Sequence, residues 1–193
     1  MTTPARMVAA LLAGVLVGCA HAGEPPLAPP ADQLAEAAAA LAAAEQSATP
    51  AQRAPLLRRI DALGLAPAED DAAAAALLAS WRAEAPAEPG GAVYRGRALG
   101  PAWRRASIKP GQSIEIEQIF YAGEQAEIAA QSTDGQPVEL EIRTQRDGTT
   151  PPVCATKLEP AGKCRWLPLF TARFRMKLVN RGGKPASVYI VFR

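Results

Sequence analysis

Apolar and polar residues alternate along much of the second half of the chain, a pattern typical of β-strands with one buried face. Every second residue is apolar in residues 114–117, 126–130, 138–143 and 173–178. The alternation slips by one residue near Gln118, which predicts a β-bulge. The final segment, Ser187 to Arg193, is apolar on both faces. Short strands at a spacing of roughly ten residues predict an antiparallel β-sandwich over residues 93–193.

Residues 31–85 have a different pattern, dominated by alanine and typical of about three helices. Thr49 followed by Pro50 has the form of a helix N-cap with proline at the first helical position. Pro55 predicts, however, that this second helix begins properly only there. The third helix is predicted to begin near Pro67.

The helical region carries little apolar surface of its own. The chain is 49% hydrophobic but only 5% aromatic, and alanine buries little area. The helices therefore either pack on the sandwich, which is the simpler interpretation, or form an arm that binds a partner. A linker rich in proline and glycine, residues 86–92, separates them from the strands, so the fold class is predicted to be α+β.

The first 22 residues are typical of an export signal. Arg6 precedes an apolar run from Met7 to Val17, which has the length of a signal-peptide core and is too short to span a bilayer. Residues 16–19 match the bacterial lipobox, in which Cys19 is lipidated and becomes the new N-terminus. Ala20 after that cysteine favours the outer membrane. The alternative is ordinary secretion with cleavage before Gly23.

A proline-rich tether, residues 23–30, follows the signal. With Cys19 lipidated or removed, Cys154 and Cys164 remain as a pair. In an oxidising compartment such a pair is expected to form a disulfide. Zinc is the rival interpretation, but two thiols without a nearby histidine or further cysteine cannot complete four ligands.

Charge is divided unequally between the two halves. Residues 19–92 carry 4 basic and 10 acidic side chains, a net charge of −6, whereas residues 93–193 carry 16 and 9, a net charge of +7. The basic half either offers a surface to an anionic envelope polymer or pairs internally with the acidic helices, which is the simpler interpretation. The whole chain has a formal net charge of +2 and no nucleic-acid-binding motif, which argues against nucleic acid as a partner.

If there is an anionic partner, such as a polysaccharide, one cluster is the candidate contact surface. Its members are basic residues with a neighbouring aromatic one: Arg95, Arg97, Trp103, Arg104 and Arg105. Trp166, two residues after Cys164, is expected to pack in the core against the disulfide. Core packing is also the simpler interpretation of Trp103.

The near absence of histidine argues against catalysis. Its one histidine, His21, lies in the signal or beside the lipidated cysteine. The globular part therefore cannot form a Ser-His-Asp triad, a Cys-His dyad or a histidine-ligated metal site. Paired glutamates on predicted strands are expected to be solvated, and no phosphate-binding loop is present. We expect no enzyme activity, no metal and no cofactor.

The segment from Trp103 to Phe192 resembles the bacterial pre-peptidase C-terminal domain. The matching features follow one another in order: Pro110-Gly111-Gln112-Ser113, Phe120 before Ala122-Gly123, the strand Val138 to Ile142, Cys154, Cys164-Arg165-Trp166-Leu167-Pro168, Phe174 to Asn180, and Tyr189. Members often carry aspartates in the strand that here reads Val-Glu-Leu-Glu-Ile, so no cation-binding role is carried over. The resemblance implies a jelly-roll-like sandwich of the kind that accompanies secreted hydrolases as a non-catalytic appendage.

These observations predict a non-catalytic lipoprotein of the bacterial cell envelope whose β-sandwich is a binding, adhesion or structural module. Its partner would be an envelope protein or an anionic polysaccharide, and a lipid on Cys19 would attach it to the membrane. The alternative is a soluble periplasmic or secreted accessory or regulatory factor for a secreted enzyme.

Overall fold

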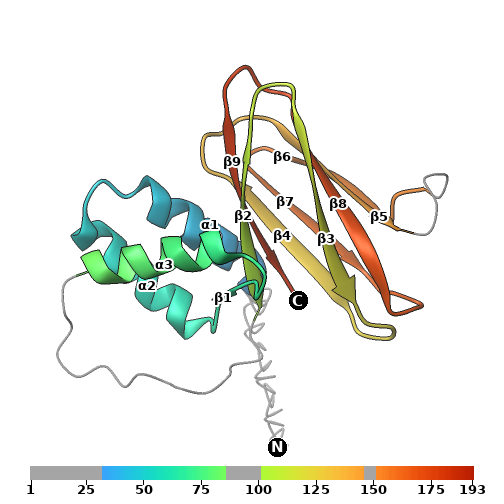
Figure 1. Ribbon diagram of the computed structural model, residues 1–193, viewed down its shortest axis with the longest axis horizontal. Helices are drawn as coiled ribbons and strands as arrows, with labels where there is room; N and C mark the ends of the chain where they lie inside the picture. Colours follow the sequence, from blue (N-terminus) through green and yellow to red (C-terminus); the bar gives the residue numbers. More distant parts are fainter. Residues whose placement is uncertain (1–31, 86–100, 146–150) are drawn as a thin grey trace, which may run out of the picture. The chain divides into compact units, whose positions relative to one another are not determined.

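The computed structural model describes residues 32–85, 101–145 and 151–193. The predicted signal, tether and linker lie outside these residues. The helices are α1 (Gln33–Gln46), α2 (Pro50–Ala62) and α3 (Ala72–Glu84). The strands are β1 (Ala66–Pro67), β2 (Ala102–Ile108), β3 (Ser113–Phe120), β4 (Ala126–Ser132), β5 (Val138–Thr144), β6 (Cys154–Leu158), β7 (Ala161–Trp166), β8 (Ala172–Asn180) and β9 (Ala186–Phe192). The predicted α+β class is confirmed (Figure 1).

Polar side chains cap the start of each helix. Asp32, Thr49 and Asp71 accept hydrogen bonds from backbone N–H groups in the first turns of α1, α2 and α3, which satisfies donors that lack intrahelical partners. Asp71 explains why α3 begins at Ala72. The prediction of a start near Pro67 was wrong, since Ala66 and Pro67 instead form β1, parallel to β2.

The prediction that α2 begins only at Pro55 was also wrong. The helix starts at Pro50 and contains Pro55 in its interior. A proline removes the hydrogen bond to the carbonyl four residues earlier. That residue, Ala51, is exposed, so water can take over the bond and the cost of the interruption falls.

The strands form two sheets that pack face to face. One sheet has the order β1-β2-β9-β4-β7 and the other β3-β8-β5-β6. Every pairing is antiparallel except that of β1 with β2. The inward faces of both sheets form one apolar core, which includes Ile128, Leu140, Met176 and Ile190.

The helices cover the outer face of the first sheet (Figure 1), and α1 lies against β4 and β9. Residues on that face of the sheet, among them Trp103, Ala129 and Tyr189, share a second apolar cluster with Leu34, Leu41 and other helix residues. This arrangement explains why β9 is apolar on both faces: one face meets the other sheet and the other meets the helices. It also shows the helices packed on the sandwich, the simpler of the two alternatives.

The bulge predicted near Gln118 is absent from β3. The strand pairs with β8 without interruption from Ser113 to Phe120. Gln118 keeps its place on the same face as Ile116 and Phe120, and Ile119 points outward with 41% of its surface exposed. The apparent slip in the sequence therefore comes from one outward-facing apolar side chain.

In the described part of the chain, none of the helices has the length and apolar character needed to cross a membrane.

Candidate functional site

The arginines predicted as a contact surface are engaged with the helical region. Arg105 on β2 forms an ion pair with Glu45 of α1, and Arg104 forms one with Asp70. Arg104 also lies over the ring of Phe192, at 6.0 Å from its centroid. Arg95 and Arg97 lie outside the described residues. The two described members of the cluster therefore match the internal-pairing alternative.

Acidic side chains also surround these arginines. A depression of about 440 Å³ beside them is lined by Asp70, Asp71, Glu115 and Glu117 as well as by Arg173. Because both signs of charge line it, the depression offers no concentrated positive potential to an anionic polymer.

Trp103 is not a surface residue. Its side chain is completely buried beneath the helices, with its ring centroid 5.7 Å from that of Tyr189. Trp103 occupies the outer face of β2, which would be exposed in an isolated sandwich but is covered here, so core packing is confirmed and the alternative of a binding role is wrong. Trp166 packs, as predicted, on the sandwich core, with its ring centroid 4.8 Å from that of Phe120.

A polar cluster joins α1 to the sheet. The carboxylate of Glu45 accepts hydrogen bonds from Arg105 Nε at 3.1 Å and from Ser187 Oγ at 3.2 Å. Burial acts to raise the pKa of Glu45, but these hydrogen bonds outweigh it and the pKa is lowered. Burial, reinforced by the Glu45 carboxylate, raises the pKa of Tyr189. The groups are matched in charge and covered by the helix, so the cluster stabilises the interface.

Further ion pairs connect distant segments of the chain on the first sheet. Asp32, at the start of α1, pairs with Lys163 of β7, and this ammonium group lowers the pKa of Asp32. Glu127 on β4 is almost fully buried and is held between Arg165 and the C-terminal Arg193, whose Nε lies 2.9 Å from its carboxylate.

Cys154 and Cys164 form the predicted disulfide. Cys154 lies in β6 and Cys164 in β7, which are the edge strands of the two different sheets. The bond therefore closes the sandwich along this edge, five residues before and four residues after the corner at residues 159–160, where the chain passes from one sheet to the other.

The most unusual surface lies at one end of the sandwich, on two neighbouring loops. The β3–β4 loop spans residues 121–125 and the β7–β8 loop spans residues 167–171. Five of the six large apolar side chains exposed in the described residues lie on these loops or beside them: Ile119 (41% exposed), Tyr121 (59%), Leu167 (57%), Leu169 (79%) and Phe170 (62%). We call these five residues the apolar tip. Contiguous exposed apolar side chains mark protein or membrane contact sites.

The two loops hold each other in place. Gly123 donates its backbone N–H to the carbonyl of Pro168 at 3.0 Å, and Ala122 donates to Thr171 Oγ1 at 3.0 Å. Gly123 has φ +75°, a conformation that favours glycine. Pro168 is buried between the exposed Leu167 and Leu169. The apolar side chains are thus presented outward from a fixed backbone.

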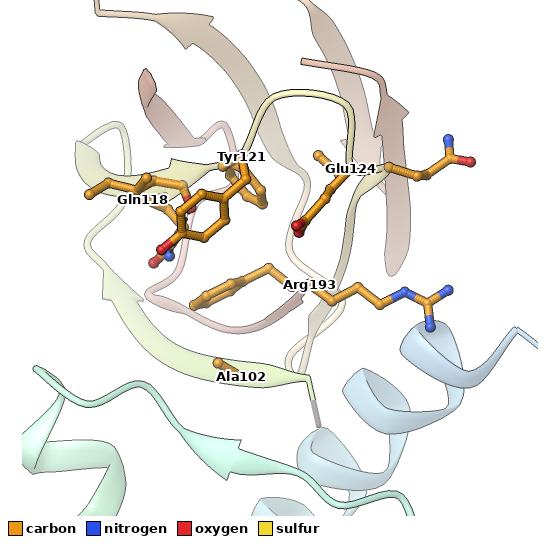
Figure 2. A pocket seen from close by; sticks show the side chains of 10 residues that line it. Ala102, Gln118, Tyr121, Glu124 and Arg193 are labelled. Atoms are coloured by element: carbon orange, nitrogen blue, oxygen red, sulfur yellow. Dashed lines mark hydrogen bonds between the residues drawn. The ribbon is translucent and has the colours of Figure 1, made fainter. Parts of the chain in front are cut away.

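A cavity of about 340 Å³ opens beside the tip (Figure 2). Its wall is mainly apolar and includes Phe120, Tyr121 and Phe192. Figure 2 shows the Glu124 carboxylate and the Tyr121 ring directed toward the cavity, whereas the guanidinium of Arg193 points away from it. Such a cavity can hold a small apolar group with one polar contact.

Sequence reasoning did not single out the apolar tip. The run from Trp166 to Ala172 contains seven residues without charge, flanked by Arg165 and Arg173. A loop with this composition is a signal that could have identified the tip. No group of three or more metal-ligating side chains occurs in residues 32–85, 101–145 or 151–193.

No protein-family model matches the sequence, and no curated protein matches it. Among solved structures, the pre-peptidase C-terminal domain of a Bacillus anthracis collagenase is 6% identical, with a TM-score of 0.39 over 48% of this chain and 89% of that one. The periplasmic inhibitor of g-type lysozyme from Aeromonas hydrophila is 12% identical, with a TM-score of 0.38 over 52% and 93%. The CBM36-1 domain of a xylanase from the hindgut metagenome of Trinervitermes trinervoides is 10% identical, with a TM-score of 0.31 over 45% and 75%. At these identities the likeness concerns the fold alone.

Proposed function

We propose that the protein is a non-catalytic binding module of the bacterial cell envelope, exported by residues 1–22 and attached to the membrane through a lipid on Cys19. The apolar tip is the observation that carries the binding role. Leu169 alone exposes 79% of its surface, and water contact of so much apolar area is unfavourable unless another molecule covers it.

Three features support the extracytoplasmic location and the absence of catalysis. The lipobox ends at Cys19, directly after the apolar run. The disulfide between Cys154 and Cys164 is typical of an oxidising compartment. The sandwich and helices carry no histidine, which removes the commonest general base near neutral pH.

The arginine cluster is the weaker candidate for the contact surface. Arg104 and Arg105 are already paired with Asp70 and Glu45. A polyanion would have to displace these carboxylates, and the helices would lose their attachment to β2.

Anchoring is tested by the intact mass of the protein recovered from a Gram-negative host. We expect a chain that begins at Cys19 and carries acyl groups. A chain that begins at Gly23 without lipid would overturn the anchor and favour a soluble accessory factor. A gain of about two mass units on reduction would report the disulfide.

The contact surface is tested by recovery of the protein with the envelope fraction, after the anchor has been removed by the substitution Cys19→Ser. The variant Leu169→Ser/Phe170→Ser is expected to lose envelope association. The matched control is Val153→Ser, which changes the one exposed large apolar residue of the described chain outside the tip. Equal association of both variants would refute the role of the tip.

A further inference from the structure

We infer that the apolar tip inserts into the interfacial region of a lipid bilayer, so that the sandwich rests on the membrane to which its N-terminus is attached. This inference rests on the proposed function and names the surface that the tip contacts. It follows from the composition of the tip, from the basic side chains behind it and from the position and length of the chain that leads into the fold.

The composition of the tip suits a bilayer interface. Leu167, Leu169, Phe170 and Tyr121 combine aliphatic and aromatic groups, and aromatic side chains are favoured at the level of the headgroups. Between Arg165 and Arg173 the β7–β8 loop has no charged residue. The loop can therefore leave water without desolvating a charge, which would be costly.

Basic side chains lie directly behind the tip. The side chains of Arg165 and Arg173 are 52% and 60% exposed, although each also contacts a glutamate, Glu127 and Glu117. Guanidinium groups at the base of the β7–β8 loop can reach lipid phosphates while the apolar side chains at its outer end lie deeper in the bilayer. Glu124, at the mouth of the cavity, limits insertion to the outer part of the loops.

The chain enters the fold over the middle of β4, where Lys163 pairs with Ala129, three strand positions from the tip end at Ala126. Asp32 pairs with Lys163, four residues before Leu167 on the strand that leads into the tip. From there α1 runs toward the opposite end of β4, where Gln46 donates a hydrogen bond to the carbonyl of Thr133. Ala126, at the other end of β4, pairs with Trp166 beside the tip.

The length of the intervening chain fits this arrangement. Twelve residues separate Cys19 from Asp32, and a chain of that length spans at most roughly 45 Å. A lipid on Cys19 would therefore keep Asp32 within that distance of the bilayer, which leaves the tip free to reach it. At that distance even a weak affinity of the tip for lipid is sufficient for contact, because the effective concentration is high.

The experiment uses the mature chain from Ala20 onward, without the anchor, so that only the folded protein can bind lipid. The probe is a vesicle of phosphatidylethanolamine and phosphatidylglycerol, and the readout is co-flotation over a range of lipid concentrations. We expect binding that persists at high salt, because burial of apolar groups is not screened. The variant Leu169→Ser/Phe170→Ser should reduce the partition coefficient at least about tenfold, and Val153→Ser should not.

A second variant directly reports how deeply the tip inserts into the bilayer. The tryptophan introduced by Leu169→Trp should add emission that shifts to shorter wavelength and is quenched by brominated lipids beyond any response of the wild-type chain, in which Trp166 lies beside the tip. The buried Trp103 and Trp81 should not respond. An unchanged melting temperature of each variant shows that the fold is intact.

Three results would overturn the inference: no flotation of the wild-type chain, equal flotation of the two serine variants, or a purified envelope protein that binds the tip while vesicles do not. None of them depends on whether Cys19 is acylated, so failure of the membrane inference can be told apart from failure of the anchor.

Discussion

Glu45 of α1 and Arg105 of β2 lie 60 residues apart in the sequence and form an ion pair across the interface between helices and sheet. Both side chains are partly buried, with exposed fractions of 25% and 34%. Asp32–Lys163 and Asp70–Arg104 are further links of this kind. The opposite charges of the two halves of the chain therefore serve, at these positions, to hold the halves together.

A double-mutant cycle with Glu45→Gln and Arg105→Gln measures the strength of this link. Each single variant should lower the free energy of unfolding by about 1–2 kcal/mol, because a partly buried polar group loses its partner. The matched control is the exposed pair Arg82–Asp61, with side chains 51% and 54% exposed, for which the coupling energy should be near zero. A coupling energy at Glu45–Arg105 no larger than the control would show that the link does not stabilise the interface.

The same carboxylate predicts a pH dependence of stability. Its pKa is lowered in the folded protein from an ordinary value of 4.5, so its stabilising contribution is complete above about pH 4.5. It is lost as the pH falls through the lower folded pKa. Chemical unfolding at a series of pH values should therefore show wild type and Glu45→Gln converging in acid. A difference that stays constant with pH would contradict the lowered pKa.

Trp103 is expected to be a core residue in solution. Trp103→Ala should lower the free energy of unfolding by about 3–5 kcal/mol, because a large cavity opens between β2 and the helices. Tyr121→Ala, at a site 59% exposed, should change it by no more than about 0.5 kcal/mol. Urea denaturation of both variants makes the comparison, and similar small effects would mean that the helices do not cover β2.

The disulfide is expected to stabilise the sandwich by closing its edge. Cys154→Ser/Cys164→Ser should lose about 2–3 kcal/mol of unfolding free energy, since the bond closes a loop of 10 residues. A reductant should lower the melting temperature of the wild type toward that of the variant and leave the variant unchanged. If the wild type does not respond to reductant although its thiols become reactive, the bond adds no stability.

Much of the fold is predictable from local patterns. Alternation of period two located the cores of β3, β4, β5 and β8, because the side chains that face the other sheet recur at every second position and the period can be read within a few residues. The predicted capping residue Thr49 coincides with the observed start of α2. Such patterns misled at Ile119, where one outward-facing apolar side chain interrupts the alternation although the strand has no bulge.

Trp103 and the apolar tip show what the sequence by itself could not decide. Trp103 stands directly before two arginines, as a surface aromatic could, and only the packing of the helices on that face buries it. Leu167, Leu169 and Phe170 have the composition of a core segment, and only the connection between two sheets puts them in an exposed loop. The chain determined its strands, helices, disulfide pair and charge division locally. Which faces are covered, and which apolar groups stay in water, depends on contacts between residues far apart in sequence, so the tertiary structure decided them.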